Sequence, residues 1–97
     1  MEKQLASLLA LLPQAEVLGS ADKVITDVTA DSRAVVAGSL FICLKGATVD
    51  GHKFLAMAAA KGAVAALVED VPAEVPQGIT LIKVADTREA MELVTPY

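Results

Sequence analysis

The sequence predicts an α/β fold, a small sandwich in which helices flank a largely parallel sheet. Short apolar or β-branched runs alternate along the chain with segments of helical spacing, the pattern of α/β layers. Hydrophobic residues make up 55% of the 97 residues and aromatic residues only 3%, so the core is built from Ala, Val, Leu and Ile. A chain of this length suits one domain, which we expect to cover 1–97.

The first half of the chain predicts one helix and two strands. Leucines recur at helical spacing over 2–12 and Pro13 ends the run, so we expect an amphipathic helix there. After a turn at 19–22, the β-branched residues of 23–30 predict a strand. The continuous apolar run 40–44 is typical of a strand buried on both faces.

The second half predicts two helices and two strands. Gly62 ends a helix that begins near Phe54, since glycine favours the left-handed conformation that closes helices. Asp86 with Glu89 three residues later resembles a capping box at the start of a last helix. The remaining segments are a strand at 64–68, a loop with two prolines at 71–78, a strand at 80–84 and the last helix at 86–94. The expected order is therefore α-β-β-α-β-β-α.

Composition excludes several classes of partner. The net charge is −4 and no cluster of Lys and Arg occurs, which argues against nucleic acid because phosphate binding needs a basic surface. No run approaches the roughly 18 apolar residues that span a bilayer. One cysteine excludes an internal disulfide and a multi-cysteine metal site. We therefore expect a cytoplasmic protein without membrane contact or a bound metal.

Gly46 and Gly51 are spaced like the glycines of a phosphate-binding P-loop, which reads G-x-x-x-x-G-K-[ST]. His52 stands at the lysine position, however, and Phe54 stands where a hydroxyl residue should be. Lys53 comes one residue late, which rotates it by about 100° on a helix. A small nucleotide hydrolase that uses this loop is an alternative, but we expect no ATP cleavage.

The same segment allows two other interpretations. Its glycines and the following helix start could hold an anion or a polar ring through backbone N–H groups. Alternatively, Asp50 merely caps the helix and the glycines merely turn the chain.

Few side chains indicate catalysis. His52 has no partner signalled nearby, so we interpret it as a neutral residue at a helix start. Cys43 lies in the most apolar strand and is expected to be a small core side chain. Asp27 and Asp31 share a strand face, either as a pair or as solvated acids at the strand end. The residues alone predict an α/β domain that binds a small ligand or a partner, without catalytic residues.

Four segments together resemble the N-terminal domain of the Mur ligases, enzymes that join amino acids to the UDP-muramoyl peptide precursor of bacterial peptidoglycan. The resemblance covers essentially the whole chain, and the segments are TADSR at 29–33, AGSLFICLKG at 37–46, DGHKF at 50–54 and AKGAVAA at 60–66. The leucine-rich start and the KGATVDGH loop are most similar to the branch that adds meso-diaminopimelate, or lysine in some bacteria, to UDP-N-acetylmuramoyl-L-alanyl-D-glutamate. The branch that adds D-Ala-D-Ala is the alternative within the family.

The resemblance implies a substrate-binding domain. It assigns the uridine diphosphate end of the precursor to two motifs, TADSR at 29–33 (the first motif) and KGATVDGH at 45–52 (the second motif). The assigned residues are Ala30 and Ser32 in the first motif and Ala47, Thr48 and Val49 in the second. Some relatives carry His-Gln-Ala in the second motif, so contacts from Ala47 and Thr48 would be made by the backbone. The strands that precede the two motifs are expected to be neighbours, which would place the two loops side by side.

The resemblance also implies what lies outside 1–97. In the family a central domain binds ATP and Mg²⁺, and a C-terminal domain receives the amino acid. Both would be absent from this chain and would be its partners in a longer cytoplasmic, amide-forming ligase of bacterial cell-wall biogenesis, cell shape and cell division. The 97 residues alone are expected to be inactive, with no catalytic residue and no cofactor. The alternative from another class is a non-enzymatic interaction module with an acidic surface.

Overall fold

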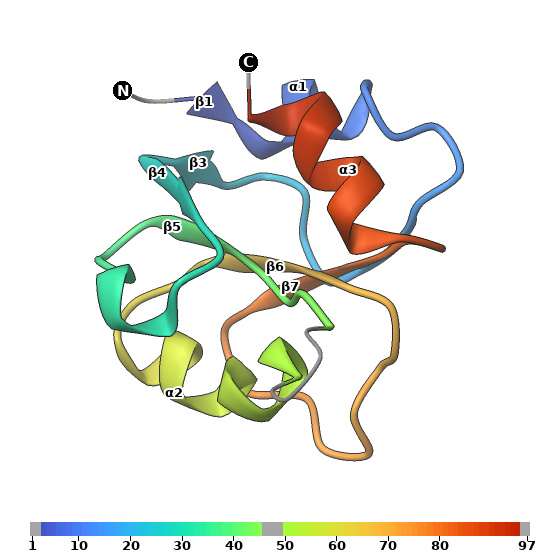
Figure 1. Ribbon diagram of the computed structural model, residues 1–97. Helices are drawn as coiled ribbons and strands as arrows, with labels where there is room; N and C mark the ends of the chain where they lie inside the picture. Colours follow the sequence, from blue (N-terminus) through green and yellow to red (C-terminus); the bar gives the residue numbers. More distant parts are fainter. Residues whose placement is uncertain (1–2, 46–49, 96–97) are drawn as a thin grey trace.

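The computed structural model describes residues 3–45 and 50–95, and Figure 1 shows their arrangement in three layers. The strands are β1 (Lys3–Gln4), β2 (Glu16–Leu18), β3 (Val24–Ile25), β4 (Asp27–Thr29), β5 (Ser39–Ile42), β6 (Ala65–Val68) and β7 (Thr80–Lys83). The helices are α1 (Leu5–Leu9), α2 (Leu55–Ala60) and α3 (Thr87–Val94), with short 3₁₀ turns η1 (Ser32–Ala34) and η2 (Gly51–Phe54).

The main sheet has the strand order β2-β7-β6-β5-β4. β4, β5, β6 and β7 are parallel, and β2 pairs antiparallel with β7 at one edge. The predicted α/β class and largely parallel sheet are therefore confirmed. β4 and β5 are neighbours, with Val28 opposite Leu40, as expected for the strands before the two motifs. Because parallel neighbours end at the same edge of a sheet, the segments that follow them leave from the same side.

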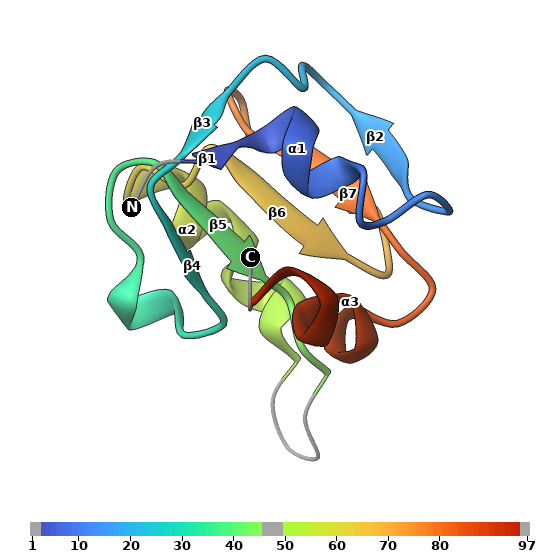
Figure 2. The ribbon, with the colours of Figure 1, turned by 90° about the horizontal axis from the view of Figure 1, so that it is seen from above.

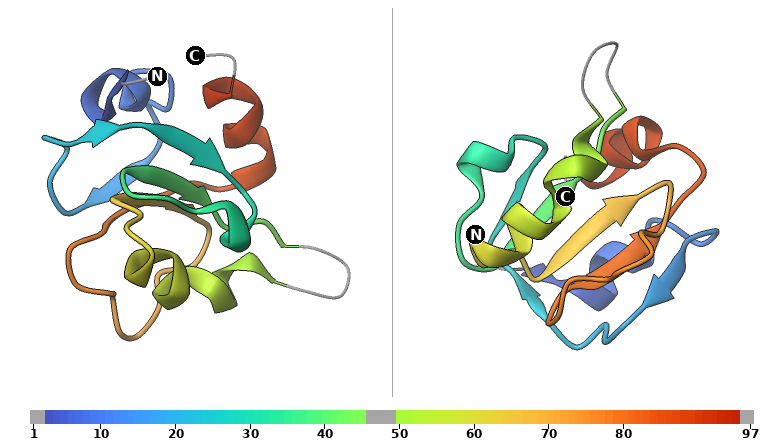
Figure 3. Two further views of the ribbon diagram at one scale, coloured as in Figure 1. Left: turned by 90° about the vertical axis from the view of Figure 1, so that its left-hand side faces the viewer. Right: turned by 90° about the horizontal axis from the view of Figure 1, so that it is seen from below.

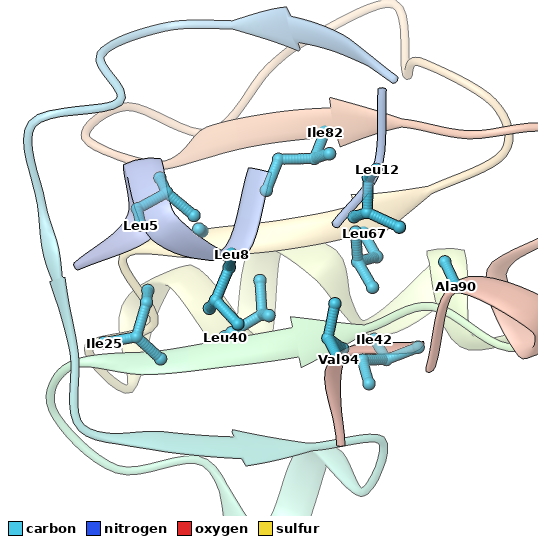
Figure 4. Close-up of a cluster of buried hydrophobic side chains, with 11 residues drawn as sticks. Leu5, Leu8, Leu12, Ile25, Leu40, Ile42, Leu67, Ile82, Ala90 and Val94 are labelled. Atoms are coloured by element: carbon cyan, nitrogen blue, oxygen red, sulfur yellow. The ribbon is translucent and has the colours of Figure 1, made fainter. Parts of the chain in front are cut away.

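α1 and α3 cover one face of the sheet, and α2 covers the other (Figures 1 and 3). Seen from above, α3 lies beside the ends of β5 and β6 (Figure 2). The core under α1 and α3 is drawn in Figure 4 and consists of Leu5, Leu8, Leu12, Ile25, Leu40, Ile42, Ala65, Leu67, Ile82, Ala90 and Val94. The core under α2 contains Phe41, Cys43, Leu55, Ala58, Ala66, Val68 and Leu81.

β5 and the residue after it supply both cores because successive side chains point to opposite faces. Leu40 and Ile42 pack under α1 and α3, whereas Phe41 and Cys43 pack under α2. The prediction of a strand buried on both faces is confirmed, although the strand ends at Ile42 rather than at residue 44. Cys43 is completely buried as expected, and burial raises the pKa of its thiol to about 12.

The predicted helix over 2–12 is too long. α1 covers only Leu5–Leu9, because Lys3–Gln4 is drawn into an antiparallel pair with Val24–Ile25. After α1 the chain tightens into a turn in which the Leu12 amide donates to the Leu9 carbonyl at 3.0 Å. The leucine spacing thus predicted which side chains are buried but not how far the helix extends.

The predicted strand over 23–30 is two strands in different sheets. The break falls at Thr26, whose amide donates to the Gly38 carbonyl at 3.0 Å and whose hydroxyl donates to the Ala37 carbonyl at 2.8 Å. These bonds take Thr26 out of both ladders, so β3 pairs with β1 while β4 pairs with β5. The β-branched composition indicated extended backbone correctly and missed the change of partner.

The remaining elements follow the predictions within a few residues, apart from β1 and β2, which were not predicted. The helix expected from Phe54 is α2, which begins at Leu55, ends at Ala60 and is followed by Gly62, whose φ is +106°. The strands expected at 64–68 and 80–84 are β6 and β7. α3 is present, and the Asp86 carboxylate accepts from the amides of Arg88 and Glu89 at 2.9 and 3.1 Å. None of the helices in the described part of the chain is both long and apolar enough to cross a membrane.

Candidate functional site

The turn after β4 carries the first motif at the carboxyl edge of the sheet. The Asp31 carboxylate accepts from the Arg33 amide at 2.8 Å and pairs with the guanidinium, 3.1 Å away at Nε. The bond from the Arg33 side chain holds the pKa of Asp31 below its usual 3.8. Asp31 therefore caps η1 and pairs with Arg33, so the alternative in which it pairs with Asp27 is not needed to explain it.

Two of the five residues assigned to the precursor lie on this turn. Ala30 follows β4 directly and is exposed, and Ser32 is half-buried at the start of η1. The Ser32 carbonyl accepts from Lys61 Nζ at 3.1 Å, which connects the turn to the end of α2. The other three, Ala47, Thr48 and Val49, lie outside the described residues.

The second motif begins just after β5, and the segments at its two described ends, Leu44–Lys45 and Asp50–His52, are called its stems. The two stems are hydrogen-bonded to each other. Lys45 and Asp50 form an antiparallel bridge, and the Gly51 amide donates to the Leu44 carbonyl at 2.7 Å. A Cβ on Gly51 would lie 2.9 Å from the Leu44 nitrogen, so this close approach of two backbones requires glycine. The Asp50 carboxylate accepts from the His52 amide at 2.9 Å, which confirms the expected cap and lowers the pKa of Asp50.

The His52 ring connects this stem to the end of β6. Its Nδ1 lies 2.6 Å from Asp50 Oδ1, and its Nε2 accepts from the amides of Glu69 at 2.9 Å and Asp70 at 3.3 Å. An amide can only donate, so Nε2 carries no proton and Nδ1–H donates to Asp50. His52 lies in η2, at the start of the helical segment, as expected. The expectation that it has no partner nearby is wrong, and the signal that could have found one is Asp50 two residues earlier.

A further set of contacts joins the end of β6 to β5 and α3. Lys45 Nζ lies 2.8 Å from Asp70 Oδ2 and 3.6 Å from Glu69 Oε1. The hydrogen bond to Asp70 raises the pKa of Lys45 and lowers that of Asp70. Glu69 Oε2 accepts from the Thr87 amide at 2.9 Å. The buried Thr87 hydroxyl lies 2.8 Å from the Cys43 carbonyl and 3.1 Å from Glu69 Oε2, so these two acceptors share its one proton.

We call Lys45, Asp50, His52, Glu69, Asp70 and Thr87 the edge cluster. Two open polar hollows adjoin it, of about 410 and about 270 Å³, and both are lined by Lys45 and Glu69. A third hollow, of about 320 Å³ and mostly apolar, lies between residues 11–15 and α3, away from the first motif. The edge cluster therefore connects the loop stems to the ends of β6 and α3, and the two polar hollows beside it are not lined by Ala30 or Ser32.

His52 and Cys43 are both unavailable for chemistry at this edge. Both ring nitrogens of His52 are engaged, and the Cys43 thiol is buried with a high pKa, so neither serves as a base or nucleophile in this conformation. No group of three His, Cys, Asp or Glu side chains within 3–45 and 50–95 is placed to hold a metal ion.

The fold and the edge cluster define a small α/β domain with a group of polar and charged side chains at the carboxyl ends of its parallel strands. The chain belongs to the Mur ligase family, because residues 24–95 match the pattern described as "Mur ligase family, catalytic domain". This confirms the resemblance carried by the two motifs.

Two relatives have the name UDP-N-acetylmuramoyl-L-alanyl-D-glutamate–2,6-diaminopimelate ligase. The protein of Bacteroides fragilis is 40% identical over 88 residues, which are 91% of this chain and 18% of the relative. That of Bacillus cereus is 44% identical over 94 residues, which are 97% of this chain and 18% of the relative. The predicted likeness to the diaminopimelate-adding branch is confirmed, and the chain spans about a fifth of the length of these relatives.

Solved structures agree with the fold. A crystal structure of MurF from Acinetobacter baumannii superposes with a TM-score of 0.80 at 28% identity, covering 97% of this chain and 20% of that one. MurF from Thermotoga maritima in complex with ADP matches with a TM-score of 0.59 at 25% identity, covering 67% of this chain and 14% of that one.

Proposed function

We propose that this chain binds the uridine diphosphate end of UDP-N-acetylmuramoyl-L-alanyl-D-glutamate, as the N-terminal domain (1–97) of a diaminopimelate-adding ligase. The names of the relatives at 40% and 44% identity support this substrate. The observation that carries the proposal is the parallel pairing of β4 with β5, because it directs both motif segments to one edge of the sheet. Ligands of open α/β sheets bind outside the carboxyl ends of strands.

Within this proposal the two motifs hold the uridine between them. Ala30 offers backbone groups and Ser32 offers a hydroxyl from the turn after β4. Ala47, Thr48 and Val49 would contribute mainly backbone groups from the opposite side. These five residues are uncharged and offer hydrogen-bonding groups, which suits an uncharged uracil and ribose better than a triphosphate.

The rest of the reaction is proposed to lie outside these 97 residues. ATP and Mg²⁺ would be bound by a central domain, and diaminopimelate, or lysine in some bacteria, by a C-terminal domain. These domains are the proposed partners of the chain within one bacterial cytoplasmic ligase of peptidoglycan synthesis. The 97 residues alone would then bind the precursor without turning it over. A coding sequence that continues past Tyr97 into a G-x-x-G-K-[ST] loop would support this arrangement, and a stop codon there would refute it.

The experiment that tests the binding role is a titration of UDP into the ¹⁵N-labelled chain, followed by NMR. We expect amide shifts at 30–33 and at the stems, Leu44–Lys45 and Asp50–His52, and weaker shifts with ADP. Ser32→Ala should weaken binding by up to about tenfold, the value of one lost hydrogen bond. Ser7→Ala, an exposed change on α1, is the matched control and should leave binding unchanged. Shifts confined to the face of α1 or α2 would refute the proposal.

A further inference from the structure

His52 is the side chain that joins the second motif to the rest of the sheet edge. It bonds at once to Asp50 in the stem and to the backbone of Glu69 and Asp70 after β6. Its side chain is only 15% exposed, so its bonds to Asp50 and to the Glu69 amide are partly shielded from water. The ring therefore fixes the distance between the stem and the end of β6.

Among the described residues, the other bonds to β6 come from the side of the first stem, where the Cys43 amide donates to the Leu67 carbonyl at 3.0 Å, and not from Asp50. The ion pair of Lys45 with Asp70 spans the same gap, but its side chains are 45% and 69% exposed, and exposed pairs contribute little. The Gly51 amide bond to the Leu44 carbonyl joins the two stems to each other and not to β6. Without an acceptor at the position of Nε2, two amides that face the ring would lose their partner.

We propose that His52 is a positioning residue for uridine binding: as the Nδ1–H tautomer it holds the Lys45 and Asp50 stems against the end of β6. This inference rests on the proposed function. His52 does not itself contact the ligand. It acts through Lys45 and Asp50, whose position relative to the end of β6 it fixes.

The first part of the inference, that His52 is the Nδ1–H tautomer, can be tested in the unaltered protein. Long-range ¹H–¹⁵N correlation spectra of the 97-residue chain at neutral pH distinguish a protonated ring nitrogen from a bare one. The inference requires the proton on Nδ1 and a bare Nε2 that accepts from Glu69 and Asp70. A spectrum of the Nε2–H tautomer, or of two tautomers in exchange, would overturn it without any mutation.

Three variants test the second part of the inference, that His52 positions the stems for uridine binding. His52→Gln places a side-chain oxygen near the position of Nε2, where it can accept from the Glu69 and Asp70 amides. His52→Asn is too short to reach them, and His52→Ala removes both contacts. Lys53→Ala is the matched control, since Lys53 is an exposed neighbour in η2. Each variant is titrated with UDP by NMR after its thermal unfolding has shown that it is folded.

We expect the dissociation constant for UDP to rise about two- to tenfold in the Asn and Ala variants and to return toward the original value in the Gln variant. Lys53→Ala should bind as the unaltered chain does. If folded Gln, Asn and Ala variants all bind alike, the acceptor contact does not position the site and the inference is wrong. If the unaltered chain shows no UDP binding, the proposed function fails, and so does the positioning role of His52 in uridine binding. The tautomer then still decides whether His52 joins the stem to β6.

Discussion

Gly51→Ala perturbs the stem of the second motif through sterics alone. The added Cβ would lie 2.9 Å from the Leu44 nitrogen, 3.1 Å from the Leu44 oxygen and 3.2 Å from the Cys43 Cα. All three are backbone atoms that follow β5, so no side chain can rotate away to make room. The Gly51 amide must also stay near the Leu44 carbonyl to keep its 2.7 Å bond.

We expect this methyl group to cost about 1–3 kcal/mol of unfolding free energy, the usual range for overpacking. In a domain of this size each 1 kcal/mol lowers Tm by about 4–8 °C, so calorimetry resolves the effect. UDP binding should weaken as well, because the stems separate.

Gly78→Ala is the informative contrast. Its Cβ meets nothing within 4 Å, but its φ is +84°, so its cost is backbone strain of about 1–2 kcal/mol. Because Gly78 lies far from the motifs in sequence and its added Cβ would touch no described residue, this variant should lose stability and keep its affinity for UDP. A Gly51→Ala variant with unchanged Tm and unchanged affinity would refute the reasoning about the stem.

Three further predictions concern the core, the edge cluster and pH. Leu67→Ala, at a completely buried position, should cost about 2–5 kcal/mol in urea unfolding, whereas Leu93→Ala, half exposed, should cost far less. Thr87→Val removes the hydroxyl that donates to the Cys43 carbonyl and should cost about 1–3 kcal/mol, while Thr87→Ser should retain most of the stability. The pKa values of Asp31, Asp50 and Asp70 are held below 3.8 by Arg33, His52 and Lys45 respectively. Their stabilisation is therefore complete above that pH and should disappear as the pH falls through the lower folded values, which urea midpoints between pH 5 and pH 2 would show.

The sequence was informative where burial decides the structure. The continuous apolar run before Lys45 predicted β5 because both faces of that strand are covered. The caps at Asp50 and Asp86 were predictable because each accepts from amides two or three residues away. Local chemistry of this kind can be read without knowing the tertiary structure.

The sequence was uninformative where distant segments decide the structure. β2 has no alternation of its own and exists because its edge pairs with β7, far along the chain. Lys3–Gln4 leaves the predicted helix for the same reason, since its partner is Val24–Ile25. The Nε2 contacts of His52 join residues 17 and 18 positions apart, which no spacing rule indicates. The adjacency of β4 and β5 came from the family resemblance rather than from residue patterns.

The central claim is that uridine binds at the carboxyl edge of β4 and β5, between the two motifs. A crystal structure of the chain grown with UDP tests this most directly. We predict the uracil ring beside the Ala30–Ser32 turn, within hydrogen-bond distance of Ser32, with the Lys45 and Asp50 stems on its other side. UDP bound instead in the hollow between residues 11–15 and α3, with the first motif unoccupied, would contradict the account.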